Sequence, residues 1–231
     1  KDIRPYLIGK DVSTFKQLAE EVDMLEINGA RIHTALRYGL TQALLDATAK
    51  SNKITMAEVV RKEYNIESTV YTRIPLFAQS GDDRYTNVDK MIIKEVEVMP
   101  HALINHIDTK LGRHGEILKE YVGWLRNRVL ELRQRDSYNP IFHIDVYGTI
   151  GTIFDNDYTK MFDYMLELEE MAHPFILRIE GPVDAGNRTD TMLALKELTA
   201  LLLNAKSTVE IVADEWCNTF DDVKYFADNN A

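Results

Sequence analysis

Apolar side chains follow two different spacings along the 231-residue chain, and the change between them lies near residue 67. Before that point, apolar positions recur every three to four residues, which predicts helices. The two stripes are Phe15, Leu18, Ala19, Val22 and Leu25, and then Ile32, Ala35, Leu36, Leu40, Ala43, Leu44 and Ala47. We expect Asn28 and Gly29 to end the first helix, and the capping-box spacing of Thr55 and Glu58 to open a third. No strand is predicted in residues 1–66.

After residue 67, short apolar runs alternate with helical stretches, which indicates parallel strands joined by right-handed crossovers. Strands are predicted near 74–79, 98–104, 141–148, 175–181 and 208–214. Helices are predicted at 115–134, 157–171 and 190–204, and from about Thr219 onwards. This repeat fits a (β/α) barrel or a doubly wound sheet, and no glycine-rich dinucleotide turn follows any strand. The pattern therefore predicts an α/β protein in which a helical segment, 1–66, precedes five β/α units, 67–231.

Composition and charge narrow the class of partner. The chain has 27 Lys and Arg against 37 Asp and Glu, a formal net charge of −10, which argues against a nucleic-acid ligand. Hydrophobic residues make up 45%, enough for a globular core, but no apolar run approaches the roughly 18–20 residues of a membrane span. The single cysteine, Cys217, excludes an intramolecular disulfide and favours a reducing compartment, so we expect a cytoplasmic protein.

Three consecutive predicted strands end in an acid. These are Asp145, Glu180 and Asp214, spaced by one β/α unit each, so their side chains should converge at one end of a parallel barrel. A single acid in this position is usually a helix cap or an ion-pair partner. Three together favour a bound cation, and Mg²⁺ is the natural choice for oxygen ligands. Asp184 and Glu215 lie close by and remain alternative ligands or partners of the ligands.

Polar side chains also lie on the earlier strands. Gln79 ends the first strand and His101 lies within the second, so both are placed to face the cavity of the three acids. An imidazole there can donate a hydrogen bond to a developing carboxylate charge or move a proton. His143 precedes Asp145 by two residues and shares its face, either as a partner of the acids or as an inward core residue.

Several strings around these residues resemble the methylaspartate ammonia-lyases of the enolase superfamily. They lie at 82–91, 99–105 (Met-Pro-His-Ala-Leu-Ile-Asn), 143–151 (His-Ile-Asp-Val-Tyr-Gly-Thr-Ile-Gly), 179–187 and 211–219, and the helical string 31–47 is similar to the family's capping domain. The resemblance extends from about residue 20 to the end. It implies a partial (β/α)8 TIM-type barrel, about five of eight strands, preceded by helices of an enolase-type capping domain.

The resemblance also implies a chemistry for the site. Asp145, Glu180 and Asp214 match the family's Mg²⁺ ligands, and the need for a monovalent cation is left open. His101 matches a histidine that binds substrate, supports the charged intermediate and serves as a second acid or base. Gln79 matches a substrate-binding glutamine. The implied reaction is elimination of ammonia from (2S,3S)-3-methylaspartate, a small amino-acid substrate, to give mesaconate in glutamate degradation, by a homodimer.

The chain departs from the family pattern in extent. The proton-abstracting lysine of the family would fall beyond Ala231, and the capping domain's first strands and the barrel's last strands are not found. We therefore expect an internal fragment of a longer enzyme. By itself it would be inactive, because its last strand would expose an apolar edge.

Two alternatives stay open. One is a racemase or cycloisomerase of the same superfamily, which the second strand, Met-Pro-His-Ala-Leu-Ile, disfavours because it lacks the Lys-x-Lys pair of those enzymes. The other is a non-catalytic, metal-binding half barrel that pairs with a second chain.

Overall fold

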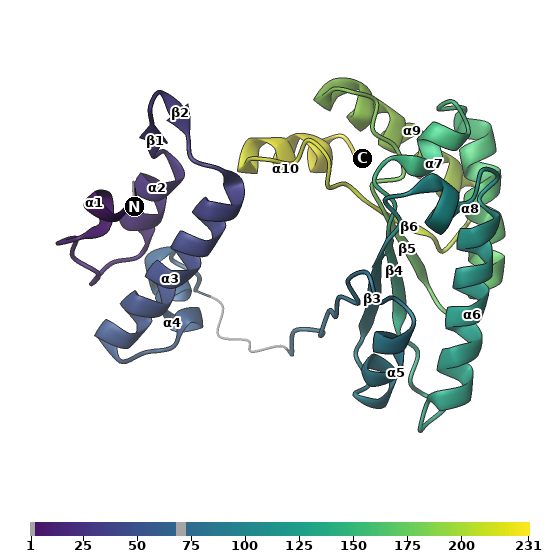
Figure 1. Ribbon diagram of the computed structural model, residues 1–231, viewed down its shortest axis with the longest axis horizontal. Coiled ribbons are helices and arrows are strands. Elements are labelled where there is room, and N and C mark those ends of the chain that lie inside the picture. Colours follow the sequence, from purple (N-terminus) through teal and green to yellow (C-terminus); the bar gives the residue numbers. More distant parts are fainter. Residues whose placement is uncertain (1–2, 68–72) are drawn as a thin grey trace. The chain divides into compact units, whose positions relative to one another are not determined.

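The computed structural model describes residues 3–67 and 73–231, which belong to two compact units (Figure 1). The first unit extends to Arg73 and the second begins at Ile74. Within the described residues, no helix is long and apolar enough to cross a membrane.

The first unit is mainly helical, as its apolar spacing predicts. Its helices are α1 (Arg4–Leu7), α2 (Lys16–Asp23), α3 (Thr34–Asn52) and α4 (Met56–Glu63). Apolar side chains from α2, α3, α4 and the residues just before α2 and α3 form its core: Phe15, Leu18, Val22, Ile32, Leu44, Ala49 and Val59. The predicted capping box is confirmed, since the Thr55 hydroxyl accepts from the Glu58 N–H and the Glu58 carboxylate accepts from the Thr55 N–H.

Two expectations for this unit are wrong: that Asn28 and Gly29 end a helix, and that residues 1–66 contain no strand. Asn28 and Gly29 do not end a helix, because α2 already stops at Asp23. Instead they form the two-residue turn between short antiparallel strands, β1 (Glu26–Ile27) and β2 (Ala30–Arg31). Both turn residues have positive φ, 56° and 76°, the conformation for which Asn-Gly is the strongest short hairpin signal.

The second unit is built on a parallel sheet, and the α/β fold expected from the alternation is confirmed. Its strands are β3 (Val98–Leu103), β4 (Ile141–Asp145), β5 (Leu177–Glu180) and β6 (Glu210–Val212), in that order across the sheet. Each strand pairs in parallel with the next along the chain, as in a segment of a β/α barrel.

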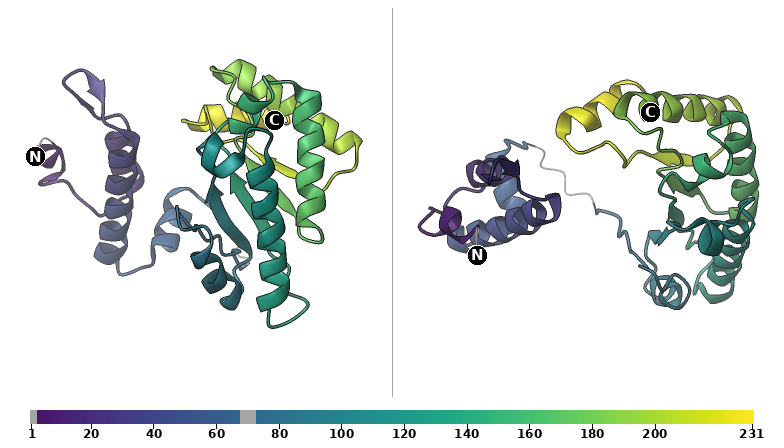
Figure 2. Two further views of the ribbon diagram at one scale, coloured as in Figure 1. Left: turned by 45° about the vertical axis from the view of Figure 1, so that its right-hand side comes forward. Right: turned by 45° about the horizontal axis from the view of Figure 1, so that its top comes forward.

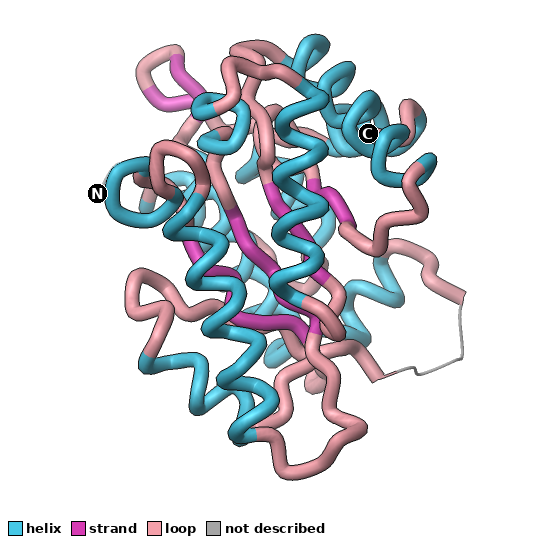
Figure 3. Tube along the Cα trace, turned by 90° about the vertical axis from the view of Figure 1, so that its right-hand side faces the viewer, coloured by secondary structure: helices cyan, strands magenta, loops and turns pink. Residues whose placement is uncertain are grey.

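Helices cover one face of this sheet, as Figures 2 and 3 show. The helices of this unit are α5 (Thr86–Ile93), the short π-helix η1 (Ile107–Leu111), α6 (Glu116–Leu132), α7 (Thr149–Ile153), α8 (Tyr158–Ala172), α9 (Arg188–Asn204) and α10 (Phe220–Asp228). The last of them, α10, does not cover the sheet and extends away from it in Figure 1. The predicted helices at 115–134, 157–171 and 190–204, and the one from Thr219, are confirmed to within two residues, whereas α1, α5, η1 and α7 are not anticipated. Buried side chains under the helices include Phe142, Ile144, Leu177 and Ile179.

The predicted strand at 74–79 is wrong as a full strand. The segment runs beside β3, and Ala78 N–H donates to Val98 O and Ser80 N–H to Pro100 O. It forms only isolated bridges, Phe77 with Val98 and Gly81 with Ala102. The ladder is interrupted because Pro100 has no N–H and because β3 bulges between Pro100 and Ala102. The described sheet therefore has four strands, not five.

Candidate active site and metal centre

The predicted acids lie at the ends of neighbouring strands. Asp145 and Glu180 are register partners at the ends of β4 and β5, and Asp214 follows β6 by two residues. After each acid the chain turns through a left-handed residue: Tyr147 (φ 49°), Gly181 (φ 57°) and Trp216 (φ 68°). Each strand therefore breaks off within two residues of its acid, and the three acids stand at one edge of the sheet.

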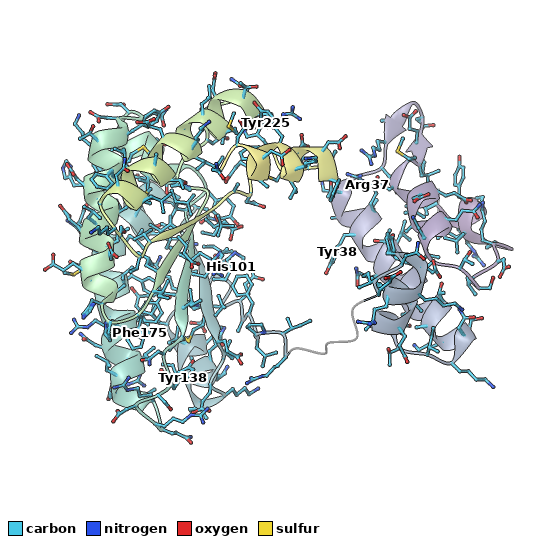
Figure 4. All side chains as sticks on the ribbon, turned by 180° about the vertical axis from the view of Figure 1, so that it is seen from behind. Arg37, Tyr38, His101, Tyr138, Phe175 and Tyr225 are labelled. Carbon is cyan, nitrogen blue, oxygen red and sulfur yellow. The ribbon has the colours of Figure 1, made fainter. Side chains whose placement is uncertain are left out.

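His101 reaches this edge from β3 by way of the bulge. Its φ of 46° is unusual for a residue with a side chain, and the bulge adds it to the face of the sheet that the helices leave uncovered (Figure 4). Its Nε2 lies 3.3 Å from Glu180 Oε2 and 3.8 Å from Asp145 Oδ2. The structure thus brings together three of the residues predicted for the site.

His143 joins the same cluster from β4. Its Nε2 donates to Glu180 Oε2 over 2.5 Å, and the residue is only 4% exposed. The ring of Phe77 lies against both imidazoles, with centroid distances of 5.0 Å to His101 and 4.7 Å to His143. Phe77 was not anticipated; the signal for it is the two-residue spacing to Gln79, which places both on one face of an extended segment.

Burial and like charges oppose ionisation of two of the acids. Burial, with the nearby Glu180 carboxylate, raises the pKa of Asp145 to about 6, and the same causes raise the pKa of Asp214. Glu180 differs, because the hydrogen bond from His143 outweighs its burial and lowers its pKa. Burial also lowers the pKa of His101, although Glu180 acts in the other direction. The cluster therefore holds more negative charge than its own side chains neutralise.

The donor atoms suit a cation. Ligand atoms of His101, His143 and Glu180 lie within 4.8 Å of one another and could hold a metal ion. The carboxylate of Asp145 borders this group, and Asp214 acts on Glu180 and His101 through its charge. Carboxylate oxygens gathered in this way are the ligands that Mg²⁺ takes in proteins.

The remaining candidates lie around this cluster. Burial raises the pKa of Glu215 to about 7, while Asp184 accepts hydrogen bonds from Trp216 Nε1 and the Gly186 N–H. Gln79 lines a shallow surface pocket with residues of α5, among them Asn87 and Lys90. Its assignment to substrate stays a prediction.

Family models match both units of the chain. The model for the N-terminus of methylaspartate ammonia-lyase matches residues 1–65, and the model for its C-terminus matches residues 68–231. Methylaspartate ammonia-lyase from Clostridium tetanomorphum is 58% identical over 231 residues, which is all of this chain and 56% of the relative. The enzyme from Citrobacter amalonaticus is 53% identical over 226 residues, which is 98% of this chain and 54% of the relative.

Solved structures of methylaspartate ammonia-lyases are similar to the chain as well. The magnesium complex of β-methylaspartase from Clostridium tetanomorphum superposes with a TM-score of 0.85 at 58% identity, covering 100% of this chain and 55% of its own. The Citrobacter amalonaticus enzyme containing (2S,3S)-3-methylaspartic acid superposes with a TM-score of 0.88 at 52% identity, covering 99% and 55%. The chain thus spans about half the length of the relatives it matches.

Proposed function

Because the chain belongs to the methylaspartate ammonia-lyase family, we propose that its strand ends form part of the active site of an enzyme that converts (2S,3S)-3-methylaspartate to mesaconate and ammonia. The observation that supports this most strongly is the cluster of Asp145, Glu180 and His101 at one edge of the sheet. Two matched structures, one a magnesium complex and one containing (2S,3S)-3-methylaspartic acid, support the choice of ligands.

In this proposal Asp145, Glu180 and Asp214 hold Mg²⁺. The fit rests on the charge of the site, since burial and mutual repulsion raise the pKa of Asp145 and Asp214 and a divalent cation would relieve both effects. When bound, Mg²⁺ would supply a Lewis acid that stabilises negative charge developing on a substrate carboxylate.

The imidazole of His101 binds substrate and supports that charge. Burial lowers the pKa of His101, so at neutral pH the ring is mainly neutral and can donate one N–H or exchange a proton. It contacts the same edge as the metal-binding acids, so a substrate carboxylate held there lies within its reach. Gln79 is proposed to bind another polar group of the substrate.

Loss of ammonia then requires removal of a proton from the carbon next to one carboxylate, followed by cleavage of the neighbouring carbon–nitrogen bond. The electron pair left by the proton forms the carbon–carbon double bond of mesaconate, and the amine leaves. The lysine expected beyond Ala231 as the base stays a prediction, as do the homodimer and the cytoplasmic location.

The test is to incubate the full-length protein with (2S,3S)-3-methylaspartate and to follow the ultraviolet absorbance of mesaconate. We expect a rise in the presence of Mg²⁺ that a chelator abolishes and added Mg²⁺ restores. A folded, magnesium-loaded protein that releases neither mesaconate nor ammonia would refute the proposed substrate and would leave the acid cluster to be tested with other carboxylic acids.

A further inference from the structure

His143 makes the shortest contact in the acid cluster, and the proposed function gives it no role. It lies on β4 two residues before Asp145, so both side chains stand on the face opposite Phe142 and Ile144. Its Nε2 bonds Glu180 Oε2 at 2.5 Å, and its Nδ1 is buried without a hydrogen-bond partner among the described residues.

The distance distinguishes a hydrogen bond from shared metal ligation. Mg²⁺ holds its ligands at about 2.0–2.1 Å in an octahedron, so two neighbouring ligand atoms of one ion stand about 3 Å apart. His143 Nε2 and Glu180 Oε2, at 2.5 Å, are too close for that, and a charge-assisted hydrogen bond, at about 2.7–2.9 Å, is the interaction nearest to their separation. Because a carboxylate only accepts, the proton of this bond is on His143 Nε2.

Both imidazoles of the cluster approach the same oxygen of Glu180. His143 and His101 contact Oε2, at 2.5 and 3.3 Å, and neither contact is to Oε1. The Phe77 ring packs on both imidazoles, and the two imidazoles meet edge to face at 86°. The plane of the His143 ring is therefore fixed from two sides, and the direction of its N–H is fixed with it.

We propose that His143 is a positioning residue that holds Glu180 by Oε2 and thereby presents Oε1 to the metal ion. The inference rests on the magnesium site of the proposed function but not on its substrate. Carboxylates that bind metals are commonly oriented by a second hydrogen bond, and loss of such a partner typically weakens metal binding 10–100-fold. The lowered pKa of Glu180 agrees, since the bond from His143 is its largest cause.

Three substitutions of His143 test this atom by atom. His143→Gln keeps an amide N–H near the position of Nε2, His143→Asn places its amide near the position of Nδ1, and His143→Phe keeps a ring without a donor. The measurement is the magnesium dissociation constant of the full-length protein by calorimetry, without substrate, with circular dichroism to confirm folding. The matched control is His173→Gln, an exposed histidine at the end of α8.

We expect the Asn and Phe variants to bind Mg²⁺ 10–100-fold more weakly, and the Gln variant and the His173 control to stay within about threefold of the original protein. Unchanged magnesium affinity in His143→Phe would overturn the proposal, because packing alone would then explain the residue. Equal weakening in the Gln and Asn variants would also overturn it.

A measurement on the unsubstituted protein covers the case in which a variant does not fold. With ¹⁵N-labelled histidine, we expect NMR to show a strongly downfield proton on His143 Nε2. An Nδ1–H tautomer would contradict the hydrogen bond on which the proposal depends. None of these readouts uses turnover. A protein that binds Mg²⁺ but fails to release ammonia would refute the proposed reaction, and the role of His143 in magnesium binding would still be measured.

Discussion

Glu169 and Asp145 lie at opposite ends of the parallel sheet, and their surroundings shift their pKa in opposite directions. Where β6 begins, Glu169 of α8 accepts hydrogen bonds from the Thr208 N–H, the Thr208 hydroxyl and the Ser207 hydroxyl, at 2.6–2.7 Å. Burial alone would raise the pKa of Glu169, but these bonds outweigh it and lower the pKa. Where β4 ends, burial and Glu180 raise the pKa of Asp145 to about 6.

This difference separates a structural acid, Glu169, from a proposed metal ligand, Asp145. The charge of Glu169 is favoured by donors of its own chain, so ionisation adds to the stability of the fold. Burial and the Glu180 carboxylate oppose ionisation of Asp145, so a positive charge bound at that end of the sheet would be favourable. A cation would stabilise the ionised carboxylate, which is why we propose the metal centre there.

The largest expected effect is on catalysis by Asp145→Asn. Removing one ionised ligand should lower the rate of mesaconate release about 1000-fold, because metal-based stabilisation of the developing charge is worth several kcal/mol. The metal-free variant should unfold at the same urea concentration as the metal-free original or at a higher one, since burial and Glu180 oppose the lost charge.

The matched substitution at the other end is Glu169→Gln, which should leave the rate unchanged. If Glu169→Gln lowered the rate as much as Asp145→Asn, or if Asp145→Asn strongly destabilised the metal-free protein, the contrast between the two ends would be wrong.

Magnesium itself should stabilise the fold through the acid cluster. At a free concentration of 100 times its dissociation constant, a ligand that binds only the folded state adds about 2.7 kcal/mol to the free energy of unfolding. We expect urea unfolding to show this gain with Mg²⁺, and chelator to remove it. An equal gain in Asp145→Asn at the same magnesium concentration would place the cation elsewhere.

At the end of the sheet where the strands begin, a neutral hydrogen bond should affect the stability of the fold and not the reaction rate. The Tyr138 hydroxyl donates to Val96 O at 2.7 Å, and both residues are buried just before β4 and β3. Tyr138→Phe leaves that carbonyl unsatisfied and should lower the free energy of unfolding by about 1–2 kcal/mol, with no change in turnover. Denaturant unfolding beside a rate assay separates the two readouts, and a loss of turnover in a folded variant would contradict the assignment.

The smallest expected effect is the pH dependence of Glu169→Gln. The pKa of Glu169 is lower in the folded protein than in the unfolded chain. Its charge therefore stabilises the fold above the unfolded-state pKa, and this stabilisation disappears as the pH falls through the folded-state pKa. The half-buried position limits this to about 1 kcal/mol at pH 7. Unfolding curves of the two proteins should converge in acid, and a constant difference down to pH 2 would show that packing, not charge, is responsible.

Much of the architecture follows from short-range patterns. The switch from helical spacing to alternating strands and helices predicts the α/β unit, and Thr55 with Glu58 predicts a cap that the structure contains. Asn28 and Gly29 carry a hairpin signal of their own, because Asn-Gly favours positive φ at both positions. The apolar spacing does not predict this hairpin, because its two strands are too short to show alternation.

Long-range effects set the limit of prediction at the site. Spacing by one β/α unit predicts that Asp145 and Glu180 meet, since register follows from parallel pairing. It does not predict that Pro100 and the bulge reduce segment 74–79 to isolated bridges, because that depends on the hydrogen bonds of the neighbouring strand. Nor does it decide which oxygen of Glu180 the His143 ring contacts, since side-chain rotamers are fixed only by packing from other elements such as Phe77.

The bulge in β3 also allows a residue on the uncovered face of the sheet to be changed without changing the core. Met99 and Ala102 both turn inward and are fully buried on either side of the extra residue, while Pro100 pairs with His143 and His101 has no partner in the register. The sequence therefore gains one side chain on the uncovered face without moving a core residue to the wrong face, which a one-residue slip in a regular ladder would do. For protein engineering, a single-residue insertion at a strand end is a way to add an acid–base group to a barrel whose core is already complete.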